Sequence, residues 1–333
     1  MKNGAFGAAC ARTFALAALS AIIGLGAGTA ASAQTYPNQP IRVIVGFPPG
    51  GAADLLARVL APHLQQELGQ PVIVENRPGA QGRVGADSVA KAKPDGHTIL
   101  MSTEGALVIT PHMGEALPYD PLKDFAPISQ VVGFAPVIVA NASLEADTLA
   151  DFIALAKKNP GKYSYGHSGI GGPNHLAMEL LKEMAGIDIA AIPYQGTGAA
   201  IPAVISNEVS LLAGAIPALT PHITAKSLKP LAVTSSERIS SVPDVPTVAE
   251  SGVAGYEMSS WVGLLAPAGT PDDVMETLHA AIAKTLKNPQ VIKSIEQGGQ
   301  TVVGSTPDAF MKRITGDYEK YGALIKSLGL AQK

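Results

Sequence analysis

Three glycine-rich segments have a composition and spacing that suit the binding of a small anion. Residues 47–54, 167–175 and 194–199 each follow a short apolar run and lead into a stretch with helical spacing. Ligands of open α/β sheets bind at the carboxyl ends of the strands, where such turns lie. A helix N-terminus offers unpaired N–H groups and partial positive charge, and glycine lets a ligand approach the backbone. We therefore predict a site for an anion such as a carboxylate; the alternative is ordinary strand-to-helix turns, in which glycine is also common.

The catalytic and nucleotide-binding motifs that these segments suggest are incomplete. Residues 46–53 have the outer spacing of a P-loop, but alanines stand where its Lys and Ser/Thr must be. Residues 169–174 lack the last glycine of a dinucleotide-binding fingerprint. Ser168 lies in a sequence that is similar to a nucleophile elbow, but Ile170 replaces the second glycine. A secreted serine hydrolase that uses Ser168 therefore stays an alternative, and a hydroxyl that donates to ligand or backbone is the preferred interpretation.

The charged residues and histidines near these segments predict no metal site and no cofactor. His167 and His175 are eight residues apart across a loop, which is not the spacing of a zinc site. Asp54 falls in the first turn of a predicted helix, where its charge stabilises the helix dipole or contacts the ligand. Arg83 follows another glycine-rich turn and can form a bidentate pair with a carboxylate, unless it is a solvated surface residue.

The elements that must position these residues alternate between β-branched runs and helical stretches. In the first part we predict strands at 41–45, 71–75 and 97–102 and helices at 52–68 and 84–93, with Pro62 kinking or breaking the first helix. The alternation restarts with helices at 149–158, 175–185 and up to 204, and strands at 163–167, 189–193, 209–213 and 228–234. The last third adds a strand at 263–267 and helices at 272–286, 289–297 and 307–328. This order is typical of α/β proteins with parallel sheets.

The two α/β units are not separated by a low-complexity linker, which favours two lobes joined by crossing strands. We place the crossings near residues 137–140 and 261–265. Lobe 1 then comprises residues 34–136 and 260–333, and lobe 2 comprises residues 137–259, with a cleft between them. The chain is long enough for two domains.

The N-terminus has the three parts of a secretory signal. Lys2 and Arg12 precede an apolar run at 15–30, and a small-residue pattern at 31–33 predicts cleavage before Gln34. The run is shorter than the ~20 residues that span a bilayer, which disfavours the alternative of an uncleaved anchor. The single cysteine lies in this leader, so the mature chain can form no disulfide. The net charge of −3 without Lys/Arg clusters argues against nucleic-acid binding. We expect a soluble, exported protein.

Short motifs along nearly the whole mature chain resemble those of one family. They are Tyr36-Pro37 with Pro40-Ile41, FPPGG with Asp54 at 47–54, VENRPGA at 74–80, KPDG at 93–96, LPYDP at 117–121, VPDVPTVAE at 242–250 and GLLAPAGTP at 263–271. In this order and spacing, the sequence resembles the tripartite tricarboxylate transporter receptors, also called the Bug family of periplasmic solute-binding proteins.

The resemblance implies a type II periplasmic binding-protein fold, an α/β fold whose two lobes have mixed or parallel sheets joined by crossing strands. It implies small carboxylate ligands held by main-chain amides and water, a membrane permease as partner, and a monomer in the periplasm. A periplasmic sensor subunit for a signalling kinase would use the same cleft and stays an alternative. The predicted ligand-binding residues are Phe47, Pro49, Gly50, Gly51, Ala52, Ala53, Asp54, Arg83, Ser102, Thr103, Glu104, His167, Ser168, Gly169, Gly171, Asn174, His175, Tyr194, Gln195, Gly196 and Gly214.

The sequence departs from the family pattern at positions that bear on the ligand. Ala53 lacks a hydroxyl that relatives usually have, and Arg83 adds a cation. Gly214 and Ala215 replace two polar residues and remove volume, although Glu104 returns a negative charge. These changes favour a bulkier carboxylate, a dicarboxylate or an aromatic one, over an amino acid.

Overall fold

The computed structural model describes residues 36–114, 116–167, 169–194 and 196–331. Residues from Gln39 onward form one compact unit, and the preceding segment is a separate unit. The predicted signal peptide, residues 1–33, lies outside the described residues. Among those described, no helix combines the length and apolar character needed to cross a membrane.

The first sheet is six-stranded and mixed. Its order is β11-β4-β10-β3-β1-β2. β1 pairs in parallel with β2 and β3, whereas β10 is antiparallel to β3 and β4. The strands are β1 (Ile41–Val45), β2 (Val72–Asn76), β3 (Thr98–Thr103), β4 (Phe125–Phe134), β10 (Ser260–Pro267) and β11 (Thr301–Val302).

The second sheet is five-stranded, with the order β7-β6-β8-β5-β9. β6 is parallel to β7 and β8, and β5 is antiparallel to β8 and β9. The strands are β5 (Val137–Asn141), β6 (Ser164–His167), β7 (Ala190–Pro193), β8 (Leu211–Gly214) and β9 (Leu228–Val233).

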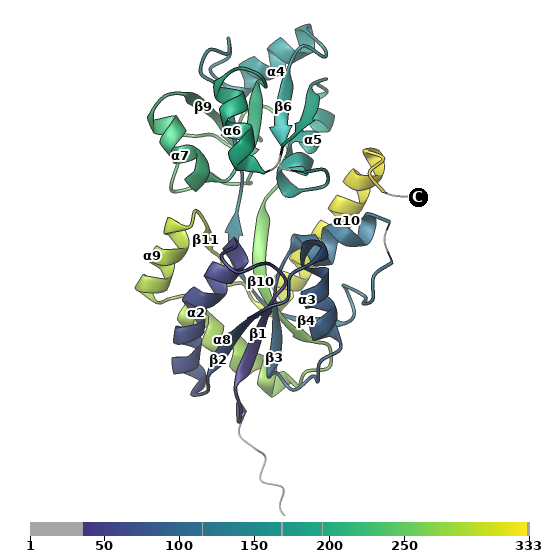
Figure 1. Cartoon of the computed structure of the whole chain (residues 1–333), viewed down its shortest axis with the longest axis vertical. Helices are drawn as coiled ribbons and strands as arrows, with labels where there is room; N and C mark the ends of the chain where they lie inside the picture. The colour runs from purple at the N-terminus through teal and green to yellow at the C-terminus, as the bar shows by residue number, and fades with distance from the viewer. Residues whose placement is uncertain (1–35, 115, 168, 195, 332–333) are drawn as a thin grey trace, which may run out of the picture. The chain divides into compact units, whose positions relative to one another are not determined.

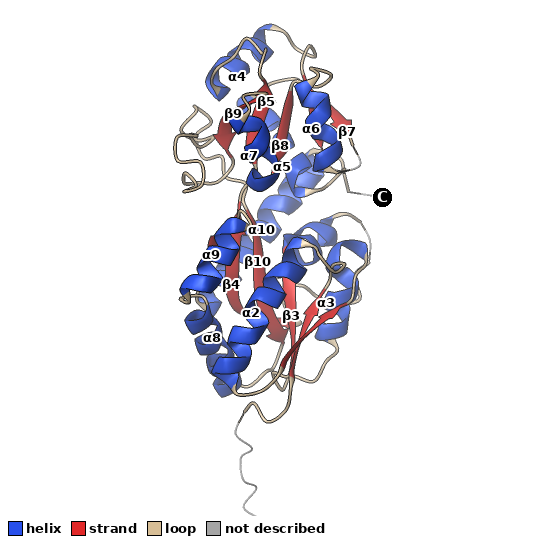
Figure 2. Ribbon diagram, turned by 60° about the vertical axis from the view of Figure 1, so that its left-hand side comes forward, coloured by secondary structure: helices blue, strands red, loops and turns tan. Residues whose placement is uncertain are grey.

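Helices cover both sheets (Figures 1 and 2). Around the first sheet, α2 packs on α8 and α9, while α10 contacts β4. These helices are α2 (Ala52–Leu68), α3 (Arg83–Ala90), α8 (Asp272–Thr285), α9 (Pro289–Gln297) and α10 (Pro307–Ser327), with short helices η1 (Ala80–Gly82), η2 (Gly105–Ile109) and η3 (Thr110–His112). The second sheet carries α4 (Leu149–Lys158), α5 (Pro173–Ala185), α6 (Thr197–Ile205) and α7 (Ile216–Thr224).

Crossing segments join the two sheets, as predicted. β4 continues into β5 through Ala135 and Pro136, and the chain returns into β10 after Met258. Where β10 crosses α10, a Cβ on Gly263 would lie 2.1 Å from the ring of Phe310. Glycine is therefore required for α10 to pack against the centre of this strand. The exact lobe boundaries at 136/137 and 259/260 stay predictions.

The structure differs from the prediction at Pro62 and in elements that the sequence pattern did not indicate, such as β4 and α7. α2 does not break at Pro62, which lies on the exposed face, where the carbonyl that loses its helical partner can reach water. β4 and α7 were not predicted, because Pro127 interrupts the pattern of the strand and α7 contains Pro217 and Pro221. Tertiary packing overrides these unfavourable local preferences.

Candidate functional site

Loops at the carboxyl edge of the first sheet pack together through glycines. A Cβ on Gly46, which follows β1, would lie 2.6 Å from the Cα of Gly82, and one on Gly85 would lie 2.8 Å from the Cα of Gly46. Gly82 has a φ of 94°, and the ring of Phe47 lies against it. Backbone contact without side chains therefore holds the Phe47 loop beside the start of α3.

The carboxylate of Asp54 organises the loop before α2. Its Oδ2 accepts the N–H of Gly50 at 2.8 Å, and its Oδ1 accepts the amide of Asn76 at 2.9 Å. Arg58, one turn along the helix, donates Nε to both oxygens at 3.0 Å. Asn76 also donates to the carbonyl of Phe47 at 3.0 Å. Asp54 is only 1% exposed, so its oxygens are used within the loop and helix.

These contacts also fix the ionisation state of Asp54. The hydrogen bond from Arg58, opposed by burial and assisted by Gly50 and Asn76, lowers the pKa of Asp54 to about 2. The carboxylate is therefore ionised at every pH at which the protein would work. The positive charge of Arg58 balances this negative charge, which also lies in the first turn of α2, where a carboxylate stabilises the helix dipole.

In the second sheet, two buried histidines hold the glycine-rich loop after β6. The Nδ1 atom of His167 accepts the N–H of Gly169 at 3.3 Å, and Nδ1 of His175 accepts the N–H of Gly171 at 3.3 Å. The two imidazole rings are 4.4 Å apart between centroids. Both glycine N–H groups are thereby directed at histidine and are not available to a ligand. The histidines shape the loop.

Burial keeps His175 neutral. Desolvation, with help from the neighbouring His167, lowers its pKa to about 4. Behind the pair, Tyr165 donates its hydroxyl to Glu179 at 2.6 Å, and Lys182 donates to the same carboxylate oxygen at 2.6 Å. A neutral imidazole can accept a hydrogen bond at Nδ1, and a protonated one cannot.

The depressed pKa of His175 predicts a specific dependence of stability on pH. Because the folded pKa of about 4 lies below the ordinary value of 6.5, the unfolded chain binds more protons between these values. The contribution to stability is complete above pH 6.5 and is lost as the pH falls towards 4, about 3 kcal/mol in all. Urea unfolding from pH 4 to 7 should therefore show a slope that His175→Gln flattens. His222→Gln, in α7, is the matched control; equal slopes in wild type and His175→Gln would refute the assignment.

The third glycine-rich turn leads into α6. Gly196 is the N-cap of this helix with a φ of 94°. Asn174, at the start of α5, donates its amide to the hydroxyl of Thr197 at 3.3 Å, which ties the first turns of the two helices together. The ring of Tyr194 packs on Gly166, and its hydroxyl donates to Glu208 at 3.0 Å. The two loops of this sheet therefore form one surface.

The capping of the helices differs between the two edges of the sheets. Within the described chain, α2, α3, α5, α6 and α7 all begin at the carboxyl edge of the parallel strands, and none has a side-chain cap. Of the helices that begin elsewhere, α4, α9 and α10 are capped by Thr148, Asn288 and Thr306, and only α8 is not. Uncapped first turns leave backbone N–H donors and positive partial charge at one edge of each sheet.

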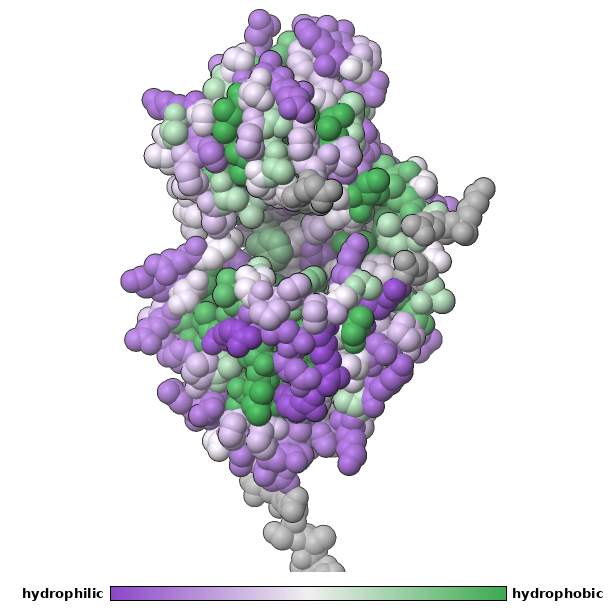
Figure 3. Space-filling model, in the orientation of Figure 1, coloured by the Kyte–Doolittle hydropathy of each residue, from purple (hydrophilic) through white to green (hydrophobic). Residues whose placement is uncertain are grey.

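The surface is hollowed between the face that carries α5 and α6 and the face that carries α2 (Figure 3). On either side of this hollow, a glycine that belongs to one sheet's part of the molecule lies close to a side chain that belongs to the other's. A Cβ on Gly171 would lie 3.2 Å from Met113, and one on Gly299 would lie 2.3 Å from Pro217. Side chains at these glycines would push the two parts away from one another.

The residues predicted around the end of β3 lie mostly in the core. Glu104 is 2% exposed and accepts the N–H of Trp261 at 3.3 Å; burial raises its pKa. Ser102 is buried and donates to the carbonyl of Thr103, whose hydroxyl accepts the N–H of Gly105. These contacts support the loop from beneath.

Arg83 and Gly214 lie among other side chains. Arg83 is half-buried. Burial raises the pKa of Tyr119, and the positive charge of Arg83 partly opposes this rise. A Cβ on Gly214 would lie 3.0 Å from Leu219 and 3.1 Å from Thr197, so these side chains lie directly beside this glycine. The extra room for a ligand at Gly214 and Ala215 stays a prediction.

The other predicted residues lie on the loops. Pro49, Gly50 and Ala52 are exposed, and Gly51 is half-buried. Ala53 is buried beneath this surface. Ser168 and Gln195 lie outside the described residues. The roles of all the predicted residues as ligand contacts remain predictions.

Sequence reasoning missed the residues that hold the loops in place. Arg58 stands four residues after Asp54, a spacing that predicts an ion pair on a helix. Asn76 directly follows a strand, at the edge where the loops meet. Thr197 gave no local signal, because its partner comes from another helix. Among the described residues, no three His, Cys, Asp or Glu side chains are placed to hold a metal ion.

Comparison with known proteins identifies the fold and the family of this chain. BugT of Bordetella pertussis is 37% identical over 321 residues, which cover 95% of this chain and 98% of that protein. A solved structure described as a periplasmic transporter is 40% identical, with a TM-score of 0.72, covering 89% of this chain and 99% of that chain. The structure of Rpa4515 of R. palustris with adipate is 31% identical, with a TM-score of 0.73, covering 89% of this chain and 99% of that chain. The structure of MatC of Rhodopseudomonas palustris with malate is 28% identical, with a TM-score of 0.69, covering 87% of this chain and 100% of that chain.

The two-sheet architecture is thus the type II periplasmic binding-protein fold, in which two lobes are joined by crossing strands. Residues 56–330 match the family described as tripartite tricarboxylate transporter family receptor. The chain belongs to this family of transporter receptors.

Proposed function

We propose that this protein is a periplasmic solute-binding protein that captures a small carboxylate between its lobes and delivers it to a tripartite tricarboxylate-type transporter. The observation that carries the proposal is the set of uncapped helix starts at the facing edges of both sheets. Backbone N–H groups of this kind bind carboxylates without a charged side chain.

A dicarboxylate fits this arrangement better than a monocarboxylate. One carboxylate can accept from the N–H groups at the start of α2, and the other from those at the starts of α5 and α6. Each hydrogen bond to a charged group contributes about 1.5–3 kcal/mol. Adipate and malate, which accompany two of the related structures, Rpa4515 and MatC, are both dicarboxylates. An aromatic dicarboxylate is the bulkier variant of the same chemistry, and Arg83 is its proposed cationic contact.

The proposed route begins with export. Residues 1–33 act as a cleavable signal, and the mature monomer has lobe 1 at residues 34–136 and 260–333 and lobe 2 at 137–259. The partner is the membrane permease of the transporter, and neither a nucleic acid nor a cofactor takes part. If the protein instead feeds a signalling kinase, the ligand-bound form should capture a kinase sensor domain rather than permease subunits from detergent extracts.

Catalysis is not part of this proposal. A hydrolase would need a histidine to activate Ser168, but the Nδ1 atoms of His167 and His175 accept glycine N–H groups. Ser168→Ala should leave a protein that binds ligand with modestly changed affinity, and wild type should show no turnover of esters or amides. Turnover that is lost in Ser168→Ala would support the hydrolase instead.

A thermal-shift screen tests the proposed ligand class. A ligand at a hundred times its Kd adds about 2.7 kcal/mol to the free energy of unfolding, which raises Tm by several degrees in a protein of this size. We expect shifts with adipate, malate and aromatic dicarboxylates, and small shifts with acetate and benzoate. Large shifts with aspartate or glutamate and none with dicarboxylates would contradict the proposal.

A further inference from the structure

A pocket of about 470 Å³, the side pocket, lies between α2 and α9, and its walls are mostly apolar. Ala52, Leu55 and Val59 of α2 line one side, and Ile295 of α9 lines the other. Pockets that bind small molecules have volumes of about 300–1,000 Å³ and predominantly apolar walls. An apolar cavity of about 150 Å³ is enough to bind benzene, so the side pocket has room for an aromatic ring.

The residues of the two helices explain why the side pocket is open. Ala52, Leu55 and Val59 lie on one face of α2 at helical spacing, and Leu55 is 56% exposed. On the α9 side the lining includes Ser294 and Gly298, which are too small to cover this face. In Figure 3, apolar residues gather in the region of α2 and α9, below the hollow. A contiguous apolar surface that is open to solvent in this way indicates a binding site.

The side pocket begins at the residue that starts α2. Ala52 is the first residue of this helix, and Gly51 before it provides no side-chain cap. The proposed carboxylate contact and the wall of the pocket therefore share Ala52. Of all positions on a dicarboxylate that binds here, the carbon next to this carboxylate lies nearest to the pocket.

The charged groups around the side pocket favour an uncharged occupant. None of the described residues that line it is acidic, and the carboxylate of Asp54 is buried within the loop and helix. Arg58 lies at the exposed edge, where its Nε and Nη2 atoms donate to Asp54 and Asn76. An ammonium group would find no acidic partner in this lining, whereas an apolar group can pack on Leu55 and Val59.

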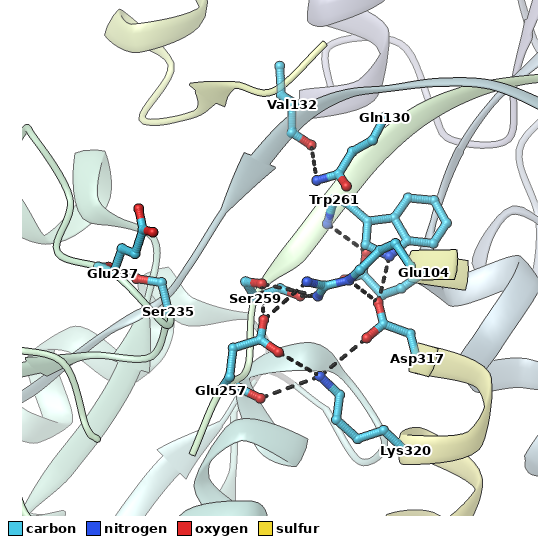
Figure 4. A network of polar contacts seen from close by, with 11 residues as sticks. Glu104, Gln130, Val132, Ser235, Glu237, Glu257, Ser259, Trp261, Asp317 and Lys320 are labelled. Carbon is cyan, nitrogen blue, oxygen red and sulfur yellow. Dashed lines mark hydrogen bonds and ion pairs between the residues drawn. The ribbon is translucent and has the colours of Figure 1, made fainter. Parts of the chain in front are cut away.

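Beside the end of β3, at the same edge of the sheet, buried side chains fill the space. Trp261 is completely buried and packs edge-on against Phe310. Its indole donates to Asp317 at 2.9 Å, and its backbone N–H donates to Glu104 at 3.3 Å (Figure 4). An apolar part of a ligand therefore fits better on the α2 side of this edge.

We propose that the side pocket is a ligand subsite that takes an aryl or branched alkyl group, carried on the carbon next to the carboxylate at the start of α2. The inference rests on the proposed function and narrows its ligand to a dicarboxylate with an apolar branch. Burial of an aromatic ring in such a pocket tightens binding by about tenfold or more. Because the exposed Leu55 leaves the pocket partly open to water, we expect the lower end of this range.

Isothermal titration with three pairs of acids tests the proposal. The pairs are succinate, glutarate and adipate, each with its 2-phenyl derivative. Wild type should bind the phenyl member of a pair about tenfold more tightly than its parent. Leu55→Gln, which makes the exposed wall polar, should reduce this ratio of Kd values to about threefold or less. Met184→Gln, at 41% exposure near the end of α5, is the matched control and should keep the ratio.

Alkylation of a single cysteine locates the phenyl group. Residues 34–333 contain no cysteine, so Ser294→Cys provides one thiol at the side pocket. Glu296→Cys, about 200° further around α9, is the matched control. At saturation, the tightest phenyl acid should slow the reaction of Ser294→Cys with iodoacetamide by about threefold or more, because the thiol loses access to solvent. Its parent acid should not slow this reaction, and neither acid should protect Glu296→Cys.

The outcomes separate this proposal from the proposed function. If none of the six acids binds, the proposed function fails and the side pocket loses its role with it. If parent acids bind but their phenyl derivatives bind no more tightly, the proposed function stands and the subsite is refuted. A full ratio in Leu55→Gln, or protection of Ser294→Cys that is equal for the phenyl and parent acids, would also overturn the subsite alone.

Discussion

Asp54→Ala should weaken dicarboxylate binding by about a hundredfold and lower the free energy of unfolding by about 2 kcal/mol. Its carboxylate holds Gly50 and Asn76, which in turn hold the loop before α2. Removing it leaves donors around this site unsatisfied, at about 1–3 kcal/mol for each buried group. The loss in stability agrees with the folded pKa of about 2 against an ordinary 3.8. Isothermal titration and urea unfolding measure the two effects.

The dependence of stability on pH separates the effect of the charge of Asp54 from the effect of the hydrogen bonds that its side chain makes. A carboxylate with a depressed pKa contributes stability that is complete above pH 3.8 and is lost as the pH falls towards 2. Asp54→Asn should remove this slope while keeping part of the loop's hydrogen bonding, so its affinity should lie between wild type and Asp54→Ala. Asp147→Ala, which removes an exposed ion pair with Lys229, is the control and should change neither quantity measurably. Wild-type affinity in Asp54→Ala would mean that the loop takes no part in binding.

Ala52→Pro should reduce dicarboxylate affinity by about tenfold to a hundredfold with little change in stability. Proline removes one N–H donor, and a hydrogen bond to a charged ligand contributes about 1.5–3 kcal/mol. The first helical position accepts proline, and the chain itself uses it at the starts of α5, α9 and α10. Gly51 before it is extended, with φ −73° and ψ 163°, which is the conformation that a residue before proline prefers.

The matched control is proline at the start of a helix on the other edge. Asp272 is exposed at the first position of α8, and Pro271 before it is extended. Asp272→Pro should leave the affinity unchanged in the same titration. If Ala52→Pro binds like wild type, or if Asp272→Pro loses as much affinity, the N–H group of Ala52 does not contact the ligand.

The sequence predicts elements well where the local pattern and the tertiary contacts agree. The bounds of β1 and α2 match the prediction, because an apolar run and helical periodicity are followed by Gly69, which ends the helix with a φ of 68°. α7 was missed because Pro217 and Pro221 hide a helix whose Ile216 and Leu219 are buried. The helix exists because that apolar face packs on the second sheet.

The candidate site could be predicted only as a set of loops. The glycines of the three segments were expected to expose donors to a ligand, but Gly169 and Gly171 donate to histidines. Gly46 and Gly82, which lie outside these segments, are needed for contact between loops. Residues that are distant in sequence, such as Asn76 beside Asp54, decide which N–H groups of the loops remain available to a ligand. A local pattern carries no information about such partners.

A crystal structure of the complex with the dicarboxylate that gives the largest thermal shift tests the central claim most directly. We expect one carboxylate 2.7–3.1 Å from backbone nitrogens at the start of α2 and the other at the same distances from those at the starts of α5 and α6. A ligand held by side-chain charges alone, or bound outside the region between these three helix starts, would contradict the account.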